Sequence, residues 1–424
     1  MSNKSNSGIA DGARSYSGVA LTVPVSFAYK KQDDSRSAPW YIGGVLRELI
    51  TTAGIAKQDV DGFAISSFSL GVDSAITLTQ NFDIAPRWIE QLPYGGCSGV
   101  IALRRAARAV QCGDANVVAC IGGDAAGHRS FEVMTSQFST FTQDAAFPYG
   151  AGGPNAAFSL ITQHYMDQFG ASREDFGRIA VAQRYNSNNY PPALFGHKTL
   201  SMEQYINSRP VAGQLHLFDC VMPCAGGEGF LVMSVERAQE LGLPYCLILA
   251  AGELHNAHSQ DDVQIRGGWT EFAPQMYADA GITPSDINLV QTYDDYPVIS
   301  MMQFEDLGFC AKGDGPEFVR TTDLRFDASG PEPRKLPHNT SGGQLSIGQA
   351  GAAAGYMGVV ENIRQLTRQS EQNQVVDARY ALASGYGMIN YDRGLCSGAA
   401  IMATSDTCVS DGSSNRLGGG QSNG

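Results

Sequence analysis

The amino-acid sequence predicts an α/β protein built from two similar halves. Eight segments have the alternating or β-branched apolar pattern of strands, and segments with helical periodicity lie between them. Strands that alternate with helices indicate mostly buried central sheets with helices packed against them. The chain has 424 residues, of which 43% are apolar and 17% charged, so it can bury a large core and is too long for one small module.

The predicted elements follow one another along the folded part of the chain, from about Val19 to Thr404. The strand patterns span residues 19–29, 60–68, 115–124, 227–235, 245–254, 287–296, 378–387 and 396–404. The helical patterns span residues 43–54, 98–113, 156–170, 272–281 and 354–369. Several of these helices end in glycine, which often follows the last helical turn because it adopts positive φ without strain.

Two features of the chain order predict how it divides into domains. A strand, a glycine-rich turn, a helix of small residues and a strand that ends in glycine occur once before residue 125 and again between residues 287 and 387. This repeat predicts an N-terminal half at 18–245 and a C-terminal half at 246–404; a chance similarity of two ordinary βαβ stretches would give the same pattern. The stretch from about 127 to 213 has few strand signals, and we interpret it as an excursion that covers a substrate cleft.

The two ends are rich in glycine, serine and asparagine, and we expect disordered tails at residues 1–17 and 405–424. The N-terminus lacks the apolar region of a signal peptide. No window reaches the roughly 18 consecutive apolar residues of a transmembrane helix, so we expect no membrane association.

Charge and cysteine content exclude some classes of function. A net charge of −13 disfavours non-specific binding to nucleic acid, and an anionic substrate would need a local positive site. The nine cysteines include no CxxC pair, so we expect no zinc ribbon and no metal site in this chain. Their odd number and apolar surroundings indicate free thiols in a reducing cytoplasm.

Five motifs carry a family resemblance: CSG at Cys97, DCVMPCAGGEGFLVMSVERAQEL from Asp219, YDDYPVISMMQFEDLGFCAKGDGPEFV from Tyr293, NTSGGQLSIGQAGAAAG from Asn339, and ASGYG from Ala383. Together they resemble the thiolase superfamily over nearly the whole folded chain. Within it they are most similar to the sterol-carrier-protein-type, or lipid-transfer, branch and to its thiolase-like acyl-CoA aldolases.

The resemblance implies a five-layered αβαβα fold with mixed sheets around buried helices. It also implies a homodimer core, acyl-CoA substrates and a separate small zinc-ribbon/OB-fold acyl-CoA-binding partner. No tightly bound cofactor is expected, because coenzyme A enters as part of the substrate, or as a co-substrate in a thiolase.

The chain departs from the thiolase pattern at two of three chemical groups. Cys97 matches the nucleophile, but the histidine of the Gly-His-Pro turn is replaced by Gln349. The turn that would hold the second cysteine reads SGYG, with Tyr386 near the acid/base position. Gln349 can donate a hydrogen bond, so we count it as substrate-binding, but it cannot act as a base.

Cys97 and His338 each have two interpretations. Cys97 precedes a helix whose N-terminus lowers a thiol pKa, which favours a reactive thiolate; alternatively, it is a small residue that fits a tight turn. His338 could replace the missing catalytic histidine, or it is an ordinary loop histidine.

Tyrosines suit a retro-aldol cleavage, which removes a hydroxyl proton, stabilises an enolate and reprotonates it without a covalent acyl-enzyme. Tyr293 and Tyr386 are the candidate acid/base groups, and the resemblance to steroid side-chain aldolases implies that tyrosines replace the thiolase groups. Each tyrosine could instead be a half-buried core aromatic, which is the favoured interpretation of Tyr296, a substrate-binding candidate. Asp294 and Asp295 could orient these side chains or lie in a solvated turn.

A glycine-rich turn is the remaining candidate for substrate binding. Asn339, Ser341, Gly342 and Gly343 resemble the turn that brings backbone N–H groups beside a thioester oxygen, and glycines allow such a close approach.

The sequence thus leaves three functional hypotheses. The first is a lyase that cleaves a branched or ring-bearing, steroid-like β-hydroxyacyl-CoA. The second is a thiolase that uses Cys97 on an unusual β-ketoacyl-CoA, such as an aryl-substituted one. The third is a non-catalytic subunit that binds acyl-CoA or lipid.

Overall fold

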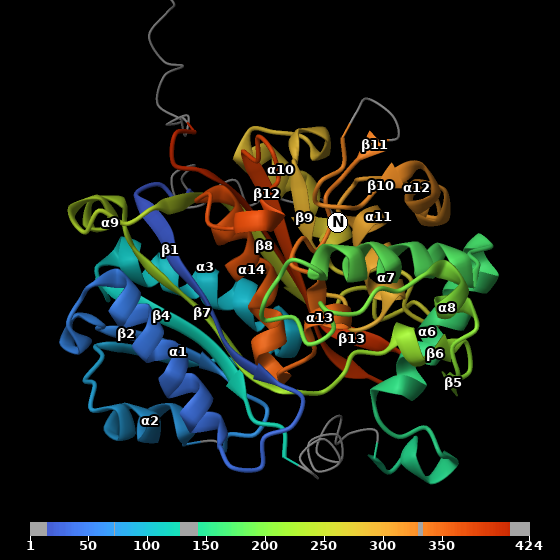
Figure 1. The fold of residues 1–424 in the computed structure, drawn as a ribbon, viewed down its shortest axis with the longest axis horizontal. Helices are drawn as coiled ribbons and strands as arrows, with labels where there is room; N and C mark the ends of the chain where they lie inside the picture. The colour runs from blue at the N-terminus through green and yellow to red at the C-terminus, as the bar shows by residue number, and fades with distance from the viewer. Residues whose placement is uncertain (1–14, 72, 128–142, 330–333, 408–424) are drawn as a thin grey trace, which may run out of the picture.

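The computed structural model describes residues 15–71, 73–127, 143–329 and 334–407. Nine strands form one mixed sheet in the order β3-β2-β4-β7-β1-β8-β13-β12-β9 (Figure 1). Their bounds are β1 (Val19–Lys30), β2 (Gly62–Ser66), β3 (Trp88–Gln91), β4 (Val117–Asp124), β7 (Ala225–Ser234), β8 (Tyr245–His255), β9 (Leu289–Gln291), β12 (Tyr380–Asn390) and β13 (Arg393–Thr404). All eight predicted strands are present, and β3 is an addition.

The strand order contains the same arrangement twice, which confirms two similar halves. In the N-terminal half, β2 pairs parallel with β4, and β4, β7 and β1 then pair antiparallel. In the C-terminal half, β9 pairs parallel with β12, and β12, β13 and β8 then pair antiparallel. Within the described residues, three residue pairs between β1 and β8 connect the two half-sheets.

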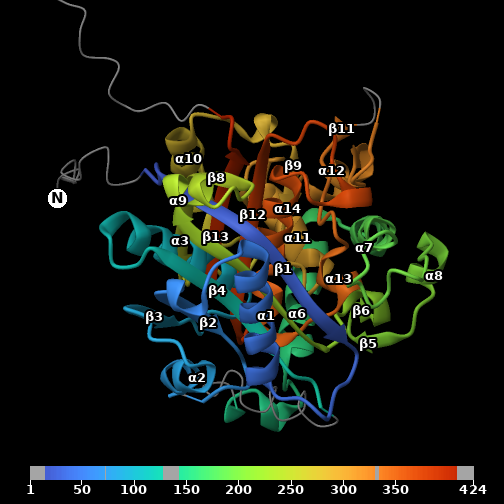
Figure 2. The ribbon, with the colours of Figure 1, turned by 60° about the vertical axis from the view of Figure 1, so that its left-hand side comes forward.

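Two buried helices lie between the half-sheets and contact strands of both. They are α3 (Ser98–Cys112) and α14 (Met357–Leu366), which also contact each other. Figure 2 shows α3 toward the left of the molecule and α14 nearer its middle. On the outer faces, α1 (Ala38–Ala53) packs on β1, β4 and β7, and α10 (Trp269–Ala280) packs on β8 and β13. This arrangement is the predicted αβαβα layering. Close approach is possible because α3 and the segment before α14 are rich in glycine and alanine.

The described part of the excursion is mostly helical. It contains α6 (Pro154–Phe169), α7 (Arg173–Ser187) and α8 (Met202–Ile206), followed by the small hairpin of β5 (Pro210–Ala212) and β6 (Leu215–His216). The sequence predicts α6 but not α7, because α7 buries the polar residues Asp175, Gln183 and Asn186, which interrupt its apolar period. Residues 128–142 of the predicted excursion lie outside the described residues.

The remaining helices and strands are short or peripheral. They are α2 (Ser74–Phe82), α9 (Val235–Glu240), α11 (Pro297–Asp306), α12 (Gly315–Thr321) and α13 (Gly343–Ile347), together with a parallel pair of β10 (Thr322–Asp323) and β11 (Arg334–Lys335). All residues of α11 are buried, so it lacks the one-sided pattern by which a helix is recognised in a sequence.

Residues 15–17 do not behave as the predicted tail. Tyr16 is buried, the Arg108 guanidinium lies 4.1 Å from the centre of its ring, and Arg108 donates a hydrogen bond of 2.6 Å to the Ser15 carbonyl. The rest of the two predicted tails, residues 1–14 and 408–424, lies outside the described residues. Among the helices that the structure describes, none is long and apolar enough to cross a membrane.

Candidate active site

Cys97 lies at the first turn of α3, as the sequence predicts, but in an enclosed environment. The residue has no solvent exposure. A Cβ added at Gly398 of β13 would lie 2.7 Å from the Cys97 Sγ, and one at Gly385 of β12 would lie 3.3 Å from it. Burial raises the Cys97 pKa well above its ordinary value, and contact with Cys396 adds to this shift. The expectation of a lowered thiol pKa is therefore wrong, because desolvation outweighs the helix N-terminus.

Tyr293 lies beside the turn that contains Cys97. It follows β9, and its ring packs directly on Gly96, where any side chain would collide with ring atoms Cε2 and Cζ. Gln303 of α11 fixes the backbone, since it accepts a hydrogen bond from the Tyr293 N–H (3.2 Å) and donates one to the Tyr293 carbonyl (2.8 Å). The β9 loop is thus held against the N-terminus of α3, and the phenol reaches the position next to Cys97.

The Tyr293 hydroxyl belongs to a three-residue hydrogen-bond cluster. It bonds to the Asp295 carboxylate and accepts a bond of 3.3 Å from the Gln349 Nε2, which also donates to the Asp295 Oδ1 at 2.6 Å. Burial and the neighbouring Asp294 raise the Asp295 pKa to about 7, although the bonds from Tyr293 and Gln349 oppose the shift. Burial and the Asp295 charge raise the Tyr293 pKa well above its ordinary value. Asp295 can therefore gain and lose a proton near neutral pH, while the resting phenol keeps its own.

Asp294 points the other way and holds the glycine-rich turn. Its carboxylate accepts backbone N–H bonds from Gln344 (3.1 Å) and Leu345 (3.3 Å) at the start of α13, and burial raises its pKa to about 6. Gly343 has a φ of 59°, and a side chain there would collide with this carboxylate. The two adjacent aspartates thus divide their tasks: Asp294 fixes the turn and Asp295 contacts the phenol.

The predicted substrate-binding turn lies next to Tyr293. Asn339, which has a φ of 44°, accepts a bond of 2.9 Å from the Thr292 N–H through its side chain. Tyr293, Asp294, Asn339, Ser341 and Gly343 line a common cavity of about 10 Å³, which is room for a single water molecule. Gly342, with a φ of 107°, packs against Ser187 of α7.

His338 does not replace the missing catalytic histidine. Its ring is fully buried against Phe304, with the ring centres 4.9 Å apart, and its Nε2 is 2.7 Å from the Thr292 Oγ1. Burial lowers its pKa to about 3, so it is neutral. His338 is a core residue that supports the β9 loop from behind.

Tyr386 points to the opposite face of β12 from Cys97, but it lies in the same buried cluster as Tyr293 and Tyr296. Strand side chains alternate, and Gly385 faces Cys97, so the next residue turns outward. The Tyr386 ring lies 6.0 Å from that of Trp269, and its hydroxyl donates a bond of 2.5 Å to the Gln264 Oε1. Burial raises its pKa far above its ordinary value. The Asp295 carboxylate is close enough to add to this pKa shift, so a role of Tyr386 in proton transfer stays a prediction.

Tyr296 connects the site to the excursion. Its hydroxyl donates a bond of 2.6 Å to the Asn155 Oδ1 of α6, and its ring stacks on Phe158 with ring centres 4.2 Å apart. Tyr296 is therefore a buried contact between the β9 loop and α6.

The structure thus brings together Tyr293, Gln349 and the turn around Ser341; His338 lies in the core behind Thr292, and Tyr386 lies on the face of β12 opposite to Cys97. From the sequence, Asp295 could be named only as a candidate group for orienting the tyrosines. The one feature of the sequence that points to it is its position two residues after Tyr293. Gln264 has no sequence signal. Among the described residues, no group of three His, Cys, Asp or Glu side chains is arranged to hold a metal ion.

Comparisons with known proteins agree with this architecture. The family model described as "Thiolase C-terminal domain-like" matches residues 250–396. A "Steroid side-chain-cleaving aldolase" from Thermomonospora curvata is 32% identical, over 79% of this chain and 86% of that protein. A "17-hydroxy-3-oxo-4-pregnene-20-carboxyl-CoA lyase" from Mycobacterium tuberculosis is 29% identical, over 87% of this chain and 96% of that protein.

Further relatives include a thiolase and two solved structures. The "Benzoylsuccinyl-CoA thiolase subunit BbsB" of Thauera aromatica is 30% identical, over 66% of this chain and 71% of that protein. The solved "Ltp2-ChsH2(DUF35) aldolase" is 28% identical with a TM-score of 0.77, over 91% of this chain and 98% of that chain. A monomeric SCP2-thiolase-like protein from Mycobacterium smegmatis, 14% identical with a TM-score of 0.66 over 92% of this chain and 78% of that chain, shares the fold. The chain therefore belongs to the thiolase superfamily, in the branch of thiolase-like acyl-CoA aldolases.

Proposed function

We propose that this protein is an acyl-CoA aldolase that cleaves a ring-bearing, steroid-like β-hydroxyacyl-CoA by a retro-aldol reaction. The observation that carries the proposal is that the Gln349 Nε2 donates both to the Tyr293 hydroxyl (3.3 Å) and to the Asp295 Oδ1 (2.6 Å), which holds the phenol and the carboxylate together beside a buried cysteine. The site therefore offers proton transfer rather than a thiolate nucleophile.

The reaction can be written from the chemistry of the relatives' substrate. In a 17-hydroxy-pregnene-20-carboxyl-CoA, the hydroxyl is on the carbon β to the thioester carbonyl. Removal of the hydroxyl proton forms a ring ketone, breaks the C17–C20 bond and leaves its electron pair on the α-carbon as an enolate. Protonation of that carbon gives propanoyl-CoA, so no free coenzyme A is consumed.

We assign the proton steps to Tyr293 and Asp295. Asp295 in its ionised form accepts the phenol proton as Tyr293 takes the proton of the substrate hydroxyl, and the pair returns a proton to the enolate carbon. Gln349, which donates to both groups, keeps them aligned. The turn of Asn339, Ser341, Gly342 and Gly343 is proposed to bind the thioester end, since Asn339, Ser341 and Gly343 line the same small cavity as Tyr293.

Product analysis tests this proposal. Purified protein is incubated with β-hydroxyacyl-CoA and β-ketoacyl-CoA substrates, with and without free coenzyme A, and the products are identified by mass spectrometry. We expect a ketone and a shortened acyl-CoA from the β-hydroxyacyl-CoA without added coenzyme A. A strict requirement for added coenzyme A would contradict the lyase.

A thiolase remains the second candidate because of the benzoylsuccinyl-CoA thiolase relative. It would cleave an unusual, for example aryl-substituted, β-ketoacyl-CoA with Cys97 as nucleophile. The Cys97→Ala variant separates the two functions: lyase activity should stay within about threefold of wild type, whereas thiolase activity would disappear. Binding of acyl-CoA with no product under any condition would instead indicate a non-catalytic subunit.

We further propose a cytoplasmic homodimer that works with a small acyl-CoA-binding partner. One similar solved structure is the Ltp2-ChsH2(DUF35) aldolase, and the partner that the sequence predicts would take the place that ChsH2(DUF35) has there. Light scattering of the purified chain and co-purification from its host cells test this assembly. Full activity of a chain that elutes from cell extracts without a partner would refute the partner.

A further inference from the structure

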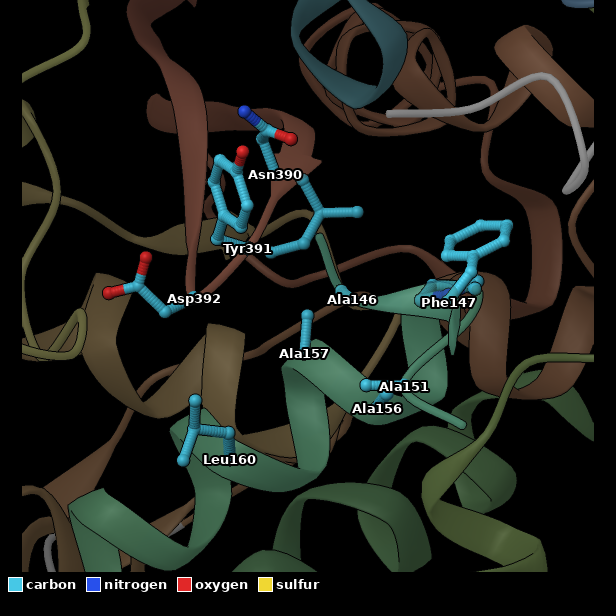
Figure 3. A pocket seen from close by; sticks show the side chains of 12 residues that line it. Ala146, Phe147, Ala151, Ala156, Ala157, Leu160, Asn390, Tyr391 and Asp392 are labelled. Atoms are coloured by element: carbon cyan, nitrogen blue, oxygen red, sulfur yellow. The ribbon is translucent and has the colours of Figure 1, made fainter. Parts of the chain in front are cut away.

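A cavity of about 270 Å³ lies between the start of α6 and the tip of the β12–β13 hairpin (Figure 3). Small side chains line its floor and larger ones its rim. The floor includes Ala151, Ala156 and Ala157, and the rim includes Phe147, Leu160 and residues 390–392. Gly153 and Ile389 also line the cavity. One face of α6 carries positions 153, 156, 157 and 160, which recur at helical spacing. Three of these four residues are glycine or alanine, so this face has mostly small side chains.

The cavity is apolar and open. Leu160 is 47% exposed and Tyr391 is 51% exposed, although both are large side chains that border a hollow. Binding of an apolar ligand would remove this surface from water, which is favourable in proportion to the area buried. Surface hollows of this kind mark ligand sites more often than isolated apolar residues do.

One polar group in the wall is available to a ligand. The Asn390 Oδ1 is buried and has no hydrogen-bond partner among the residues that the structure describes. Asp392 is the one carboxylate among the described residues that line the cavity, and it is paired with Arg393 at 2.6 Å. None of these lining residues is a lysine or an arginine, so the cavity does not suit the phosphates of coenzyme A.

The cavity is at the catalytic end of the fold. Met388, which immediately precedes the hairpin tip, packs against Gly95 in the turn before Cys97. The first turns of α6 also carry Asn155 and Phe158, and both of these residues contact Tyr296 in the β9 loop. Both walls of the cavity are therefore attached directly to the segments that carry the proposed chemistry.

From these observations we infer that the cavity holds the fused hydrocarbon rings of the acyl group, with a hydroxyl substituent of the ring system donating a hydrogen bond to the Asn390 Oδ1. The inference rests on the proposed function. Pockets for drug-sized ligands span about 300 to 1,000 Å³, so a cavity of 270 Å³ suits a ring system rather than a whole acyl-CoA.

Two variants and one control test this site. Ala157→Phe fills the floor with an aromatic ring, and Asn390→Leu removes the amide. The control is Gln168→Phe, which adds the same ring to an exposed position of α6 outside the cavity. Thermal unfolding of each variant identifies loss of folding.

The probes are a matched pair of substrates, one ring ketone and testosterone. The substrates are 17-hydroxy-3-oxo-4-pregnene-20-carboxyl-CoA and the ring-free 3-hydroxy-2,3-dimethylbutanoyl-CoA, which has the same reacting centre. The ketone is androst-4-ene-3,17-dione, and its binding and that of testosterone are measured by equilibrium dialysis without any coenzyme A. This binding measurement depends on the cavity and not on catalysis.

We expect Ala157→Phe to weaken ketone binding at least tenfold and to lower kcat/KM for the steroid substrate by a similar factor. Turnover of the ring-free substrate should stay within twofold, and Gln168→Phe should match wild type throughout. Asn390→Leu should weaken binding of testosterone, whose ring hydroxyl can donate to the Asn390 Oδ1, several-fold, and it should leave binding of the diketone within twofold. Ketone binding by Ala157→Phe within twofold of wild type would overturn the site. If wild-type protein turned over neither substrate, the proposed function would fail, while the dialysis result would still decide on the ring site.

Discussion

The oxygen of Tyr293 has an acceptor and a donor as its two neighbours, the Asp295 carboxylate and the Gln349 amide N–H. Tyr293→Phe removes the hydroxyl and keeps the ring that packs on Gly96. General acid–base groups contribute about 10²- to 10⁴-fold, so we expect kcat to fall by at least about 100-fold with a small change in KM. Steady-state kinetics with the β-hydroxyacyl-CoA measures this effect.

The matched control is Tyr386→Phe, which removes a phenol on the outer face of β12. It leaves the Gln264 Oε1 with one bond, from the Gly394 N–H, among the described residues. We expect a loss of roughly 1–3 kcal/mol in the free energy of unfolding and kcat within about threefold of wild type. An equal loss of kcat in both variants would contradict the assignment of Tyr293 alone.

The pKa of Asp295, about 7 against an ordinary value of 3.8, predicts the pH dependence. Below pH 7 the carboxyl is protonated and cannot accept the phenol proton, so kcat/KM should fall about tenfold per pH unit as the pH decreases. Asp295→Asn should have a low rate without this ascending limb. A flat profile for wild type between pH 5 and 8 would contradict the role of Asp295. The same raised pKa makes ionised Asp295 a cost to stability that grows as the pH rises from about 4 through 7.

At the scale of elements, the glycines of β12 and β13 make the room that Cys97 occupies. Gly398→Ala would place a methyl group 2.7 Å from the Cys97 Sγ, and overpacking of a core costs about 1–3 kcal/mol. Cys97→Ala removes the sulfur, so the double variant should recover part of that loss. Urea unfolding of the four proteins gives the coupling energy; strict additivity would mean that the two residues do not meet.

The elements also show what a sequence can and cannot predict. The eight strands, α3 and α14 were predictable because their apolar residues recur at the spacing of a strand or of a helix, and the repeated order came from them. The side on which Tyr386 lies was not predictable, because a glycine-rich strand has no alternating pattern that fixes which face is inward. Asp295 could be located but not given a role, since its pKa depends on contacts with Gln349, which is 54 residues away.

The whole molecule joins its halves mainly through helices rather than through the sheet. Three residue pairs connect β1 with β8, whereas α3 and α14 each contact strands of both halves. Neither half can keep its buried helix covered without the other. We therefore expect one cooperative unfolding transition, with calorimetric and van't Hoff enthalpies that agree once dissociation of any dimer is included. Two separate transitions would show that the halves are independent.

The enclosure of Cys97 has a practical consequence for the chemistry of the protein in air. Its sulfur is shut off from solvent and keeps its proton, so alkylating agents and peroxide should not reach it, whereas Cys112 on the surface should react readily. Peptide mapping after iodoacetamide treatment of the native protein would show carbamidomethylation at 112 and none at 97. Because oxidants do not reach Cys97, we expect treatment with peroxide to leave the activity of this protein unchanged under conditions that inactivate enzymes with an exposed catalytic thiol.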